Sequence, residues 1–271
     1  MSVGGLRFAL TFLTRLPLPG RNDDLAEAGP RSVGAFPLVG AAVGGLLGLV
    51  TWLLQMVPAV PNGVASCLVL TFWVAITGGL HLDGLMDTAD GLAGGRSPDH
   101  VLRIMRDSRV GAMGVVAGVL LLLWKFAAIG ALLAHPPRDV AIGLLLPPLW
   151  SRWALALAII RWPYARTDGL GQLFRPPTAP VADRGDGGNR LSGEVEVTFW
   201  ALTITAVAAV VAPVPPTVLL LVPMVTGGML VSCANRWSRR LGGLTGDLYG
   251  ALNELIETAT LVVLAVALGW T

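Results

Sequence analysis

Charged residues are scarce in this sequence. They make up 13% of the 271 residues, about half the share of a typical soluble domain. Hydrophobic residues make up 54%, and the mean hydropathy is +0.69. These values exclude an ordinary soluble domain and predict a membrane protein with several spans.

Cysteine and histidine are also rare. The two cysteines, Cys67 and Cys233, lie in separate apolar runs, which excludes a disulfide framework and a paired-cysteine metal site. None of the three histidines has a recognisable nucleophile partner, so Ser–His–Asp catalysis is not supported. His81 lies close to the acidic side chains described below. It either contacts the side chains that form a site there or is an ordinary histidine at the membrane interface. The net charge of +2, without a basic patch, indicates no nucleic-acid partner.

Seven hydrophobic runs mark candidate membrane spans. They cover residues 36–57, 63–82, 110–134, 140–160, 197–212, 216–234 and 258–270. The last three are shorter or interrupted by proline, so six or eight spans would also fit. No repeat or change of composition divides the chain. We therefore predict one all-α domain over residues 1–271, a polytopic transmembrane helical bundle.

The N-terminal segment is too short and too charged to span. Its apolar stretch, residues 3–16, is interrupted by Arg7 and Arg15, which favours a helix lying in the membrane interface. A long apolar core followed by a small-residue cleavage site is absent. We therefore expect no cleaved signal peptide.

With seven spans, the connecting segments form two alternating sets. One set is the N-terminal segment together with 83–109, 161–196 and 235–257. It holds every basic residue except Lys125, Arg138 and Arg152, so the positive-inside rule makes it cytoplasmic. Lys125 and Arg152 fall inside the third and fourth runs. Lys125 either snorkels or faces the bundle interior, and for Arg152 contact with an anionic ligand is an equal alternative.

The stretch 78–111 is polar although it lies between two apolar runs. If it begins as a helix, Asp83, Asp87 and Asp90 fall within an arc of about 60° on one face. Such a stack repels itself unless a cation binds, and carboxylate oxygens suit Mg²⁺, Mn²⁺ or Ca²⁺. Any one of these acids alone would more simply cap a helix end. Three on one face favour a functional site, and Gly84 and Gly91 leave room for a substrate or a second helix.

A second acidic face follows in 235–257. If a helix begins at 245 or 246, Asp247 and Glu254 share one face, with Asn253 and Glu257 near its edge. Arginines just before it, Arg240 among them, would hold phosphates or meet lipid headgroups. Acids, arginines and glycines on one membrane side suit a substrate with a diphosphate, because a metal would stabilise the leaving group and a carboxylate would accept the proton of an attacking hydroxyl.

Four stretches resemble the signature segments of the cobalamin synthase family, the adenosylcobinamide-GDP ribazoletransferases. They are FLTRLP at 12–17, FPLVG at 36–40, the segment 78–111 with HLDGLMDTADG and RIMRDSRVG, and RLGGLTGDLYGALNELIE at 240–257. The resemblance implies a Mg²⁺-dependent enzyme of the bacterial inner membrane. It would join adenosylcobinamide-GDP to α-ribazole or its 5′-phosphate by attack of the ribazole 3′-hydroxyl on the diphosphate, with GMP as leaving group.

Roles for individual residues are hypotheses based on their positions in the sequence. The predicted metal ligands are Asp83, Asp87, Asp90, Asp247 and Glu254, the last two completing a second metal position or holding the ribazole. The predicted general base is Asp107, with Asp90 as the alternative. The predicted phosphate and substrate contacts are Arg103, Arg106, Arg109, Arg240 and Asn253. Mg²⁺ is the expected cofactor, and Mn²⁺ is a possible substitute.

Two other functions stay open. DTADG at 87–91 is similar to the opening of the CDP-alcohol phosphotransferase motif, although the Ala-Arg and the second Asp pair of that motif are missing. An ion-coupled transporter would carry acids near mid-bilayer, and runs three to seven show none in their middles. The lipid bilayer is an expected partner and nucleic acid is not. Association with other corrinoid-assembly enzymes, or with a second copy through glycine-rich segments such as 39–48, is a further possibility.

Overall fold

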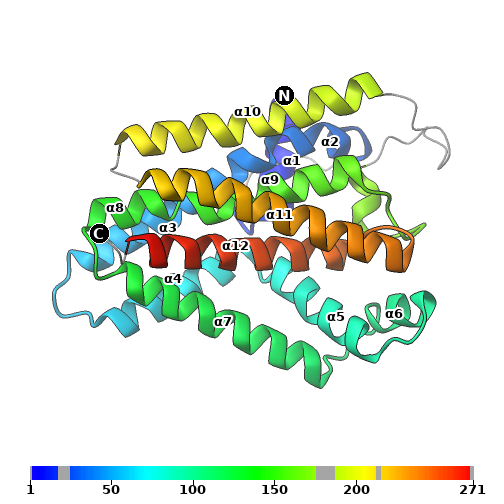
Figure 1. The fold of residues 1–271 in the computed structure, drawn as a ribbon, viewed down its shortest axis with the longest axis horizontal. Helices are drawn as coiled ribbons and strands as arrows, with labels where there is room; N and C mark the ends of the chain where they lie inside the picture. The colour runs from blue at the N-terminus through cyan, green and yellow to red at the C-terminus, as the bar shows by residue number, and fades with distance from the viewer. Residues whose placement is uncertain (1, 18–24, 175–186, 212–214, 269–271) are drawn as a thin grey trace.

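The fold is helical throughout the residues that the computed structural model describes, 2–17, 25–174, 187–211 and 215–268 (Figure 1). The helices are α1 (Val3–Leu13), α2 (Leu25–Ser32), α3 (Phe36–Gln55), α4 (Asn62–Thr77), α5 (Leu80–Gly94), α6 (Pro98–Ile104), α7 (Ala112–Leu132), α8 (Pro137–Gly143), α9 (Leu146–Arg161), α10 (Gly187–Val211), α11 (Pro216–Leu241) and α12 (Gly246–Leu268). Two 3₁₀ turns are η1 (Val33–Ala35) and η2 (Leu170–Phe174). Within these ranges the β structure is one isolated bridge, between Tyr164 and Leu244.

Six of the described segments are long and apolar enough to cross a membrane. They are Ala28–Gln55, Ala112–Leu132, Pro137–Arg161, Leu191–Val211, Pro216–Leu241 and Gly246–Ala267. The pair α4 and α5 makes a seventh if the two helices count as one broken span. The chain is a multi-pass membrane protein, and the predicted helical bundle is confirmed.

The second predicted run, 63–82, is broken in the structure. The axes of α4 and α5 differ by 89°, and the two residues between them, Gly78 and Gly79, have φ angles of 65° and 69°. Residues with a Cβ rarely adopt this left-handed conformation, so the glycine pair permits the sharp turn. The bend turns α5, which carries Asp83, Asp87 and Asp90, away from the direction of α4.

The last two spans also differ from the prediction. α11 continues to Leu241, and α12 begins at Gly246, as expected for the acidic helix, but then runs without a break through the predicted span. Glu254 and Glu257 therefore lie inside a span. The expectation that the later spans carry no acid in their middles is wrong.

The predicted alternation of connecting segments appears in the arrangement of the helices. The links 95–111, 162–169 and 242–245 lie at one end of the bundle, at the right of Figure 1, and the links 56–61 and 133–136 lie at the other. The link 95–111 with its four arginines thus lies at the same end as the last turns of α11, which carry Arg236, Arg239 and Arg240.

Helix α12 occupies the middle of the bundle and packs against α5, α7, α9 and α11. Its crossing with α5 is close because glycines meet there: a Cβ added to Gly84 would lie 2.8 Å from the carbonyl oxygen of Asp247, and one added to Gly250 would lie 3.0 Å from that of His81. The room left by Gly84 is taken by a second helix. This crossing sets Asp83 beside Asp247.

The glycine-rich segment 39–48 packs within the chain. Gly40, Gly44 and Gly48 face the backbone of the α8–α9 segment so closely that any side chain would collide with it. These glycines therefore serve the contact of α3 with its own bundle.

Candidate active site

A cavity of about 240 Å³ opens between α1, α3, α5, α9, α12 and the segment that follows α9, including η2. Its apolar and aromatic lining consists of Phe12, Phe36, Leu80, Leu155, Ile159, Tyr164, Leu170, Phe174 and Tyr249. Its polar lining consists of His81, Asp83, Arg166 and Asp247, with glycines at 84, 169, 171, 246 and 250. The cavity is therefore mostly apolar with a few convergent polar groups, the usual composition of a small-molecule site.

Acids from two helices meet at this cavity. Asp83 on α5 and Asp247 on α12 both line it, held together by the glycine crossing. Asp87 follows Asp83 by one turn and is close enough to Asp83, Asp90 and Asp247 for their charges to act on it. Acids from the two acidic faces therefore lie close together in the structure.

Sequence reasoning missed Arg166, the arginine that reaches these acids. Its Nη2 lies 2.9 Å from Oδ2 of Asp247 and donates to the carbonyl oxygen of Leu102 at 3.4 Å. Its Nε is buried without a hydrogen-bond partner among the described residues. One arginine thus faces several carboxylates, and the local charge is negative.

A short backbone pairing positions Arg166. The amide of Ala165 donates to the carbonyl of Leu244 at 2.8 Å, and the amide of Leu244 donates to that of Pro163 at 2.7 Å. This joins the link after α9 to the turn before α12. Because the pairing is non-local, no spacing in the sequence predicts it. Burial raises the pKa of the neighbouring Tyr164, so its hydroxyl stays protonated at neutral pH.

Asp90 is occupied by the backbone of another helix. Its Oδ2 accepts from the amide of Gly111 at 2.7 Å and its Oδ1 from the amide of Gly114 at 2.8 Å. These amides belong to the N-terminal turn of α7, whose donors lack partners within the helix and where a negative charge is favourable. Asp90 therefore caps α7, and the capping alternative that the sequence left open for a single acid describes it.

Asp107 lies outside the cavity and pairs with a neighbour. Its carboxylate accepts from Nε of Arg109 at 3.0 Å and from Nη2 at 2.6 Å. These hydrogen bonds lower the pKa of Asp107 to about 2. A carboxylate with so low a pKa is a weak proton acceptor, so the arrangement does not favour Asp107 as a general base.

The predicted phosphate contacts do not line the cavity. Nη2 of Arg106 pairs with Asp168 at 2.6 Å on the exposed surface, and Arg103 is exposed in the last turn of α6. Nη2 of Arg240 donates to the carbonyl oxygen of Gly95 at 3.1 Å. Asn253 is fully buried, and its side-chain amide has no partner among the described residues.

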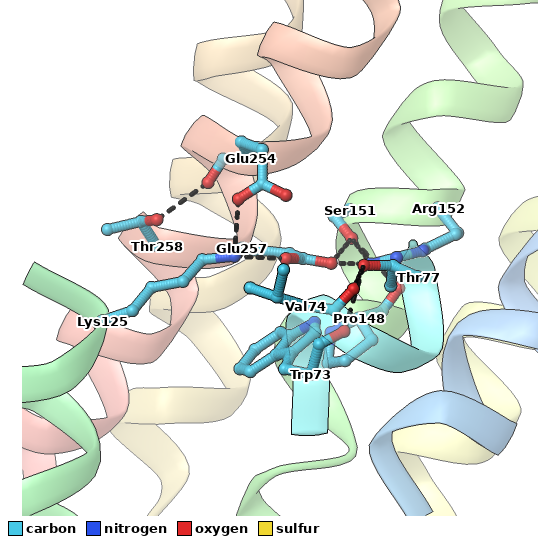
Figure 2. A network of polar contacts seen from close by, with 10 residues as sticks. All are labelled: Trp73, Val74, Thr77, Lys125, Pro148, Ser151, Arg152, Glu254, Glu257 and Thr258. Atoms are coloured by element: carbon cyan, nitrogen blue, oxygen red, sulfur yellow. Dashed lines mark hydrogen bonds and ion pairs between the residues drawn. The ribbon is translucent and has the colours of Figure 1, made fainter. Parts of the chain in front are cut away.

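Glu254 belongs to a buried ionic network rather than to the cavity wall. Figure 2 shows Nζ of Lys125 between the two glutamates of α12, 2.6 Å from Oε2 of Glu254 and 2.6 Å from Oε2 of Glu257. The same nitrogen lies 4.5 Å from the ring centroid of Trp73. Lys125 faces the bundle interior, which was one of its two predicted placements.

The second cation of the network comes from α9. Arg152 is fully buried and forms an ion pair with Oε1 of Glu257 (Figure 2). The hydroxyl of Ser151 lies 3.0 Å from Nη1 of Arg152 and 3.4 Å from Oε1 of Glu257. Two cations thus balance two anions, while Nε and Nη2 of Arg152 have no hydrogen-bond partner among the described residues.

No group of three or more His, Cys, Asp or Glu side chains in the described parts of the chain is arranged to hold a metal ion. Asp83, Asp87 and Asp247 come nearest to the predicted metal site in chemistry, because they are oxygen donors in excess of the local positive charge.

Comparison with known proteins gives a clear relationship. The sequence profile of cobalamin-5-phosphate synthase matches residues 5–265. The chain belongs to the cobalamin-5-phosphate synthase family. It is 38% identical over 256 residues to an adenosylcobinamide-GDP ribazoletransferase of Desulfitobacterium hafniense, covering 94% of each chain. It is 39% identical over 266 residues to the protein of that name from Ectopseudomonas mendocina, covering 97% of this chain and 98% of the other. No solved structure matches.

The segments that resemble this cobalamin synthase family meet at the cavity although they are far apart in the chain. FLTRLP contributes Phe12 and FPLVG contributes Phe36. The HLDG segment contributes His81, Asp83 and Gly84, and TGDLYG contributes its residues 246, 247, 249 and 250. Their convergence makes this cavity the candidate active site.

Proposed function

We propose that this chain joins adenosylcobinamide-GDP to α-ribazole or its 5′-phosphate and releases GMP. Membership of the cobalamin synthase family gives the reaction class, and the named relatives are adenosylcobinamide-GDP ribazoletransferases. The observation that carries the proposal is the meeting of Asp83 and Asp247, with Asp87 nearby, at a cavity to which all four family-like segments contribute.

The donor atoms of this site suit a divalent cation in their chemistry, although the described side chains are not arranged around a metal position. Asp83, Asp87 and Asp247 supply carboxylate oxygens from two helices, and Arg166 forms an ion pair with Asp247. Mg²⁺, or Mn²⁺ in its place, would neutralise the diphosphate and stabilise the departing GMP when bound. Glu254 is engaged with Lys125 and is the least suited of the predicted ligands.

The remaining steps fall to the side chains of the cavity. Arg166 would hold phosphate oxygens, because a guanidinium binds them with charge-assisted hydrogen bonds and its Nε lacks a partner among the described residues. The oxygen of the ribazole 3′-hydroxyl would bond to the phosphorus next to the cobinamide arm while the bond to GMP breaks. Asp83 or Asp247 would accept the hydroxyl proton, since both line the cavity.

We further propose that the site faces the cytoplasm at the bacterial cell membrane. The arginine-rich link 95–111 and the link 162–169, which carries Arg166, lie at the same end of the bundle as the cavity-lining start of α12 (Figure 1). Positive residues favour the cytoplasmic side. Labelling of single cysteines placed in these links, in intact cells and in inverted vesicles, tests the orientation.

GMP release by the purified protein tests the activity. Adenosylcobinamide-GDP and α-ribazole 5′-phosphate are supplied in detergent with and without Mg²⁺, and the expected release requires the metal and both substrates. Asp87→Asn should abolish it, whereas Asp99→Asn, an exposed acid on α6, should not. If the protein instead released CMP from a CDP-alcohol and no GMP, this result would favour a CDP-alcohol phosphotransferase. Transport can be measured only across a closed membrane. Turnover in detergent, without vesicles, would therefore identify the protein as an enzyme and not a transporter.

A further inference from the structure

The cavity has an aromatic lining from five elements of the chain. The ring of Phe174 meets that of Phe12 edge-on at 4.9 Å and that of Phe36 at 5.5 Å between centroids. On the α12 side, the rings of Tyr164 and Tyr249 stack at 6.2 Å with 23° between their planes. All five rings line the cavity. Aromatic walls of this kind suit a flat aromatic ligand, which can stack on them or meet their edges.

The volume of the cavity restricts which reactant can enter. About 240 Å³ is small for a ligand pocket, since drug-sized sites hold about 300–1,000 Å³. A corrin macrocycle is much larger than this space, whereas the bicyclic base of a nucleoside is not. Both proposed substrates carry such a base, guanine in one and the benzimidazole of ribazole in the other.

The lining distinguishes these two bases. Guanine carries several hydrogen-bonding groups on its edge, and each would lose its water on burial. A glycosylated benzimidazole has one free ring nitrogen. The lining is mainly carbon, and His81, whose ring nitrogens are buried without partners among the described residues, belongs to it. This wall therefore matches the benzimidazole better, with His81 as the candidate partner of its nitrogen.

We propose that the cavity is the acceptor site, in which the aromatic rings hold the base of α-ribazole. The inference rests on the proposed function. The ribose then lies beside Asp83, Asp247 and Arg166, which line the same cavity, so its 3′-hydroxyl faces the acids assigned to catalysis. The corrinoid and the guanosine of the other substrate stay outside this cavity.

Two neighbouring residues of α9 provide the test and its control. Ile159 lines the cavity, whereas Ile160 points toward α10, where its Cδ1 lies 3.5 Å from the position of a Cβ on Gly193. Ile159→Trp should raise KM for α-ribazole about tenfold or more by filling the cavity, with KM for adenosylcobinamide-GDP unchanged. Ile160→Trp should leave both constants unchanged.

Two kinetic outcomes would overturn the assignment. A rise in KM for adenosylcobinamide-GDP alone would mean that the cavity holds guanosine, and no change in either constant would mean that it holds neither base. If Ile159→Trp does not fold, Phe174→Leu gives the same readout. Loss of this aromatic surface should raise KM for α-ribazole about fivefold or more, and an unchanged KM would contradict the proposal.

A binding measurement separates this inference from the proposed function. Equilibrium dialysis of α-ribazole against the detergent-purified protein requires no turnover. If the wild type releases no GMP, the proposed reaction fails, but binding that is lost in Ile159→Trp and kept in Ile160→Trp would still support the acceptor site. Equal binding by both variants would reject the site even if the wild type is active.

Discussion

Helix α12 carries acids in two different settings. Near its start, Asp247 lies at the cavity with Asp83 and Asp87 nearby, and one arginine faces the group. Farther along, Glu254 and Glu257 are buried and each meets a cation from another helix. The first group has excess negative charge beside open space, and the second is balanced and closed.

This difference separates a site from a structural device. Inside a membrane protein, a buried carboxylate persists when a cation and hydrogen bonds satisfy it, and the glutamates of α12 meet this condition. Acids that outnumber their cations remain costly until a metal or a substrate group neutralises them.

Removing a carboxylate from the cavity should affect activity and not folding. Asp247→Asn keeps the shape of the side chain but removes a charge assigned to metal binding, so kcat/KM should fall about a thousandfold. The midpoint of thermal unfolding in detergent should stay near that of the wild type. A large loss of stability would mean that Asp247, like Glu257, has a structural role.

Removing a cation from the network should have the opposite effect. Lys125→Met leaves Glu254 and Glu257 with too little positive charge, which should lower the free energy of unfolding by about 3–5 kcal/mol. The double variant Lys125→Met, Glu254→Gln should recover part of the loss, because it restores the charge balance. Denaturant titration in detergent measures both. Unchanged stability with lost turnover would instead make the network part of the site.

Arg166 pairs with Asp247 at the cavity, whereas Arg106 pairs with Asp168 on the exposed surface. The same substitution at the two arginines therefore compares a cavity position with a surface position. Arg166→Gln should raise KM for adenosylcobinamide-GDP about 10- to 100-fold, since charge-assisted contacts to phosphate would be lost. Arg106→Gln breaks an exposed ion pair and should change KM less than about twofold. Equal effects of the two variants would return the phosphate role to the exposed arginines.

Asp90 should behave as a cap. Asp90→Asn keeps an acceptor but loses the charge at the start of α7, so the free energy of unfolding should fall by about 1 kcal/mol. Turnover at saturating substrate should remain close to that of the wild type. Complete loss of turnover with unchanged unfolding would restore Asp90 as a metal ligand or general base.

The smallest effect is expected for Asp107→Asn. Arg109 holds the pKa of Asp107 at about 2, below its ordinary value of about 3.9. Any stability from this pair is therefore present above the ordinary value and disappears as the pH falls toward 2. From about pH 5 upward the group is ionised throughout, so rate–pH profiles of wild type and Asp107→Asn should coincide there. A much lower plateau rate in the variant, with the acid limb of the wild-type profile lost, would identify Asp107 as the base after all.

Much of this protein follows from local properties of its sequence. Hydropathy over about 20 residues identifies a helical span, and the placement of arginines separates the two sets of links. The spacing of Asp83 and Asp87 places them on one helical face, and a helix beginning at 246 was expected from the acidic pattern. These features depend only on neighbours in the chain.

Only the tertiary structure determines which acids are available to bind a metal or a substrate. The pairing of residues 163–165 with Leu244 brings Arg166 to Asp247, and α7 binds Asp90 with its first amides. Lys125 and Arg152 neutralise glutamates more than a hundred positions away. The free energy of a carboxylate depends on the charges and donors that packing brings to it, and helical spacing does not contain that information.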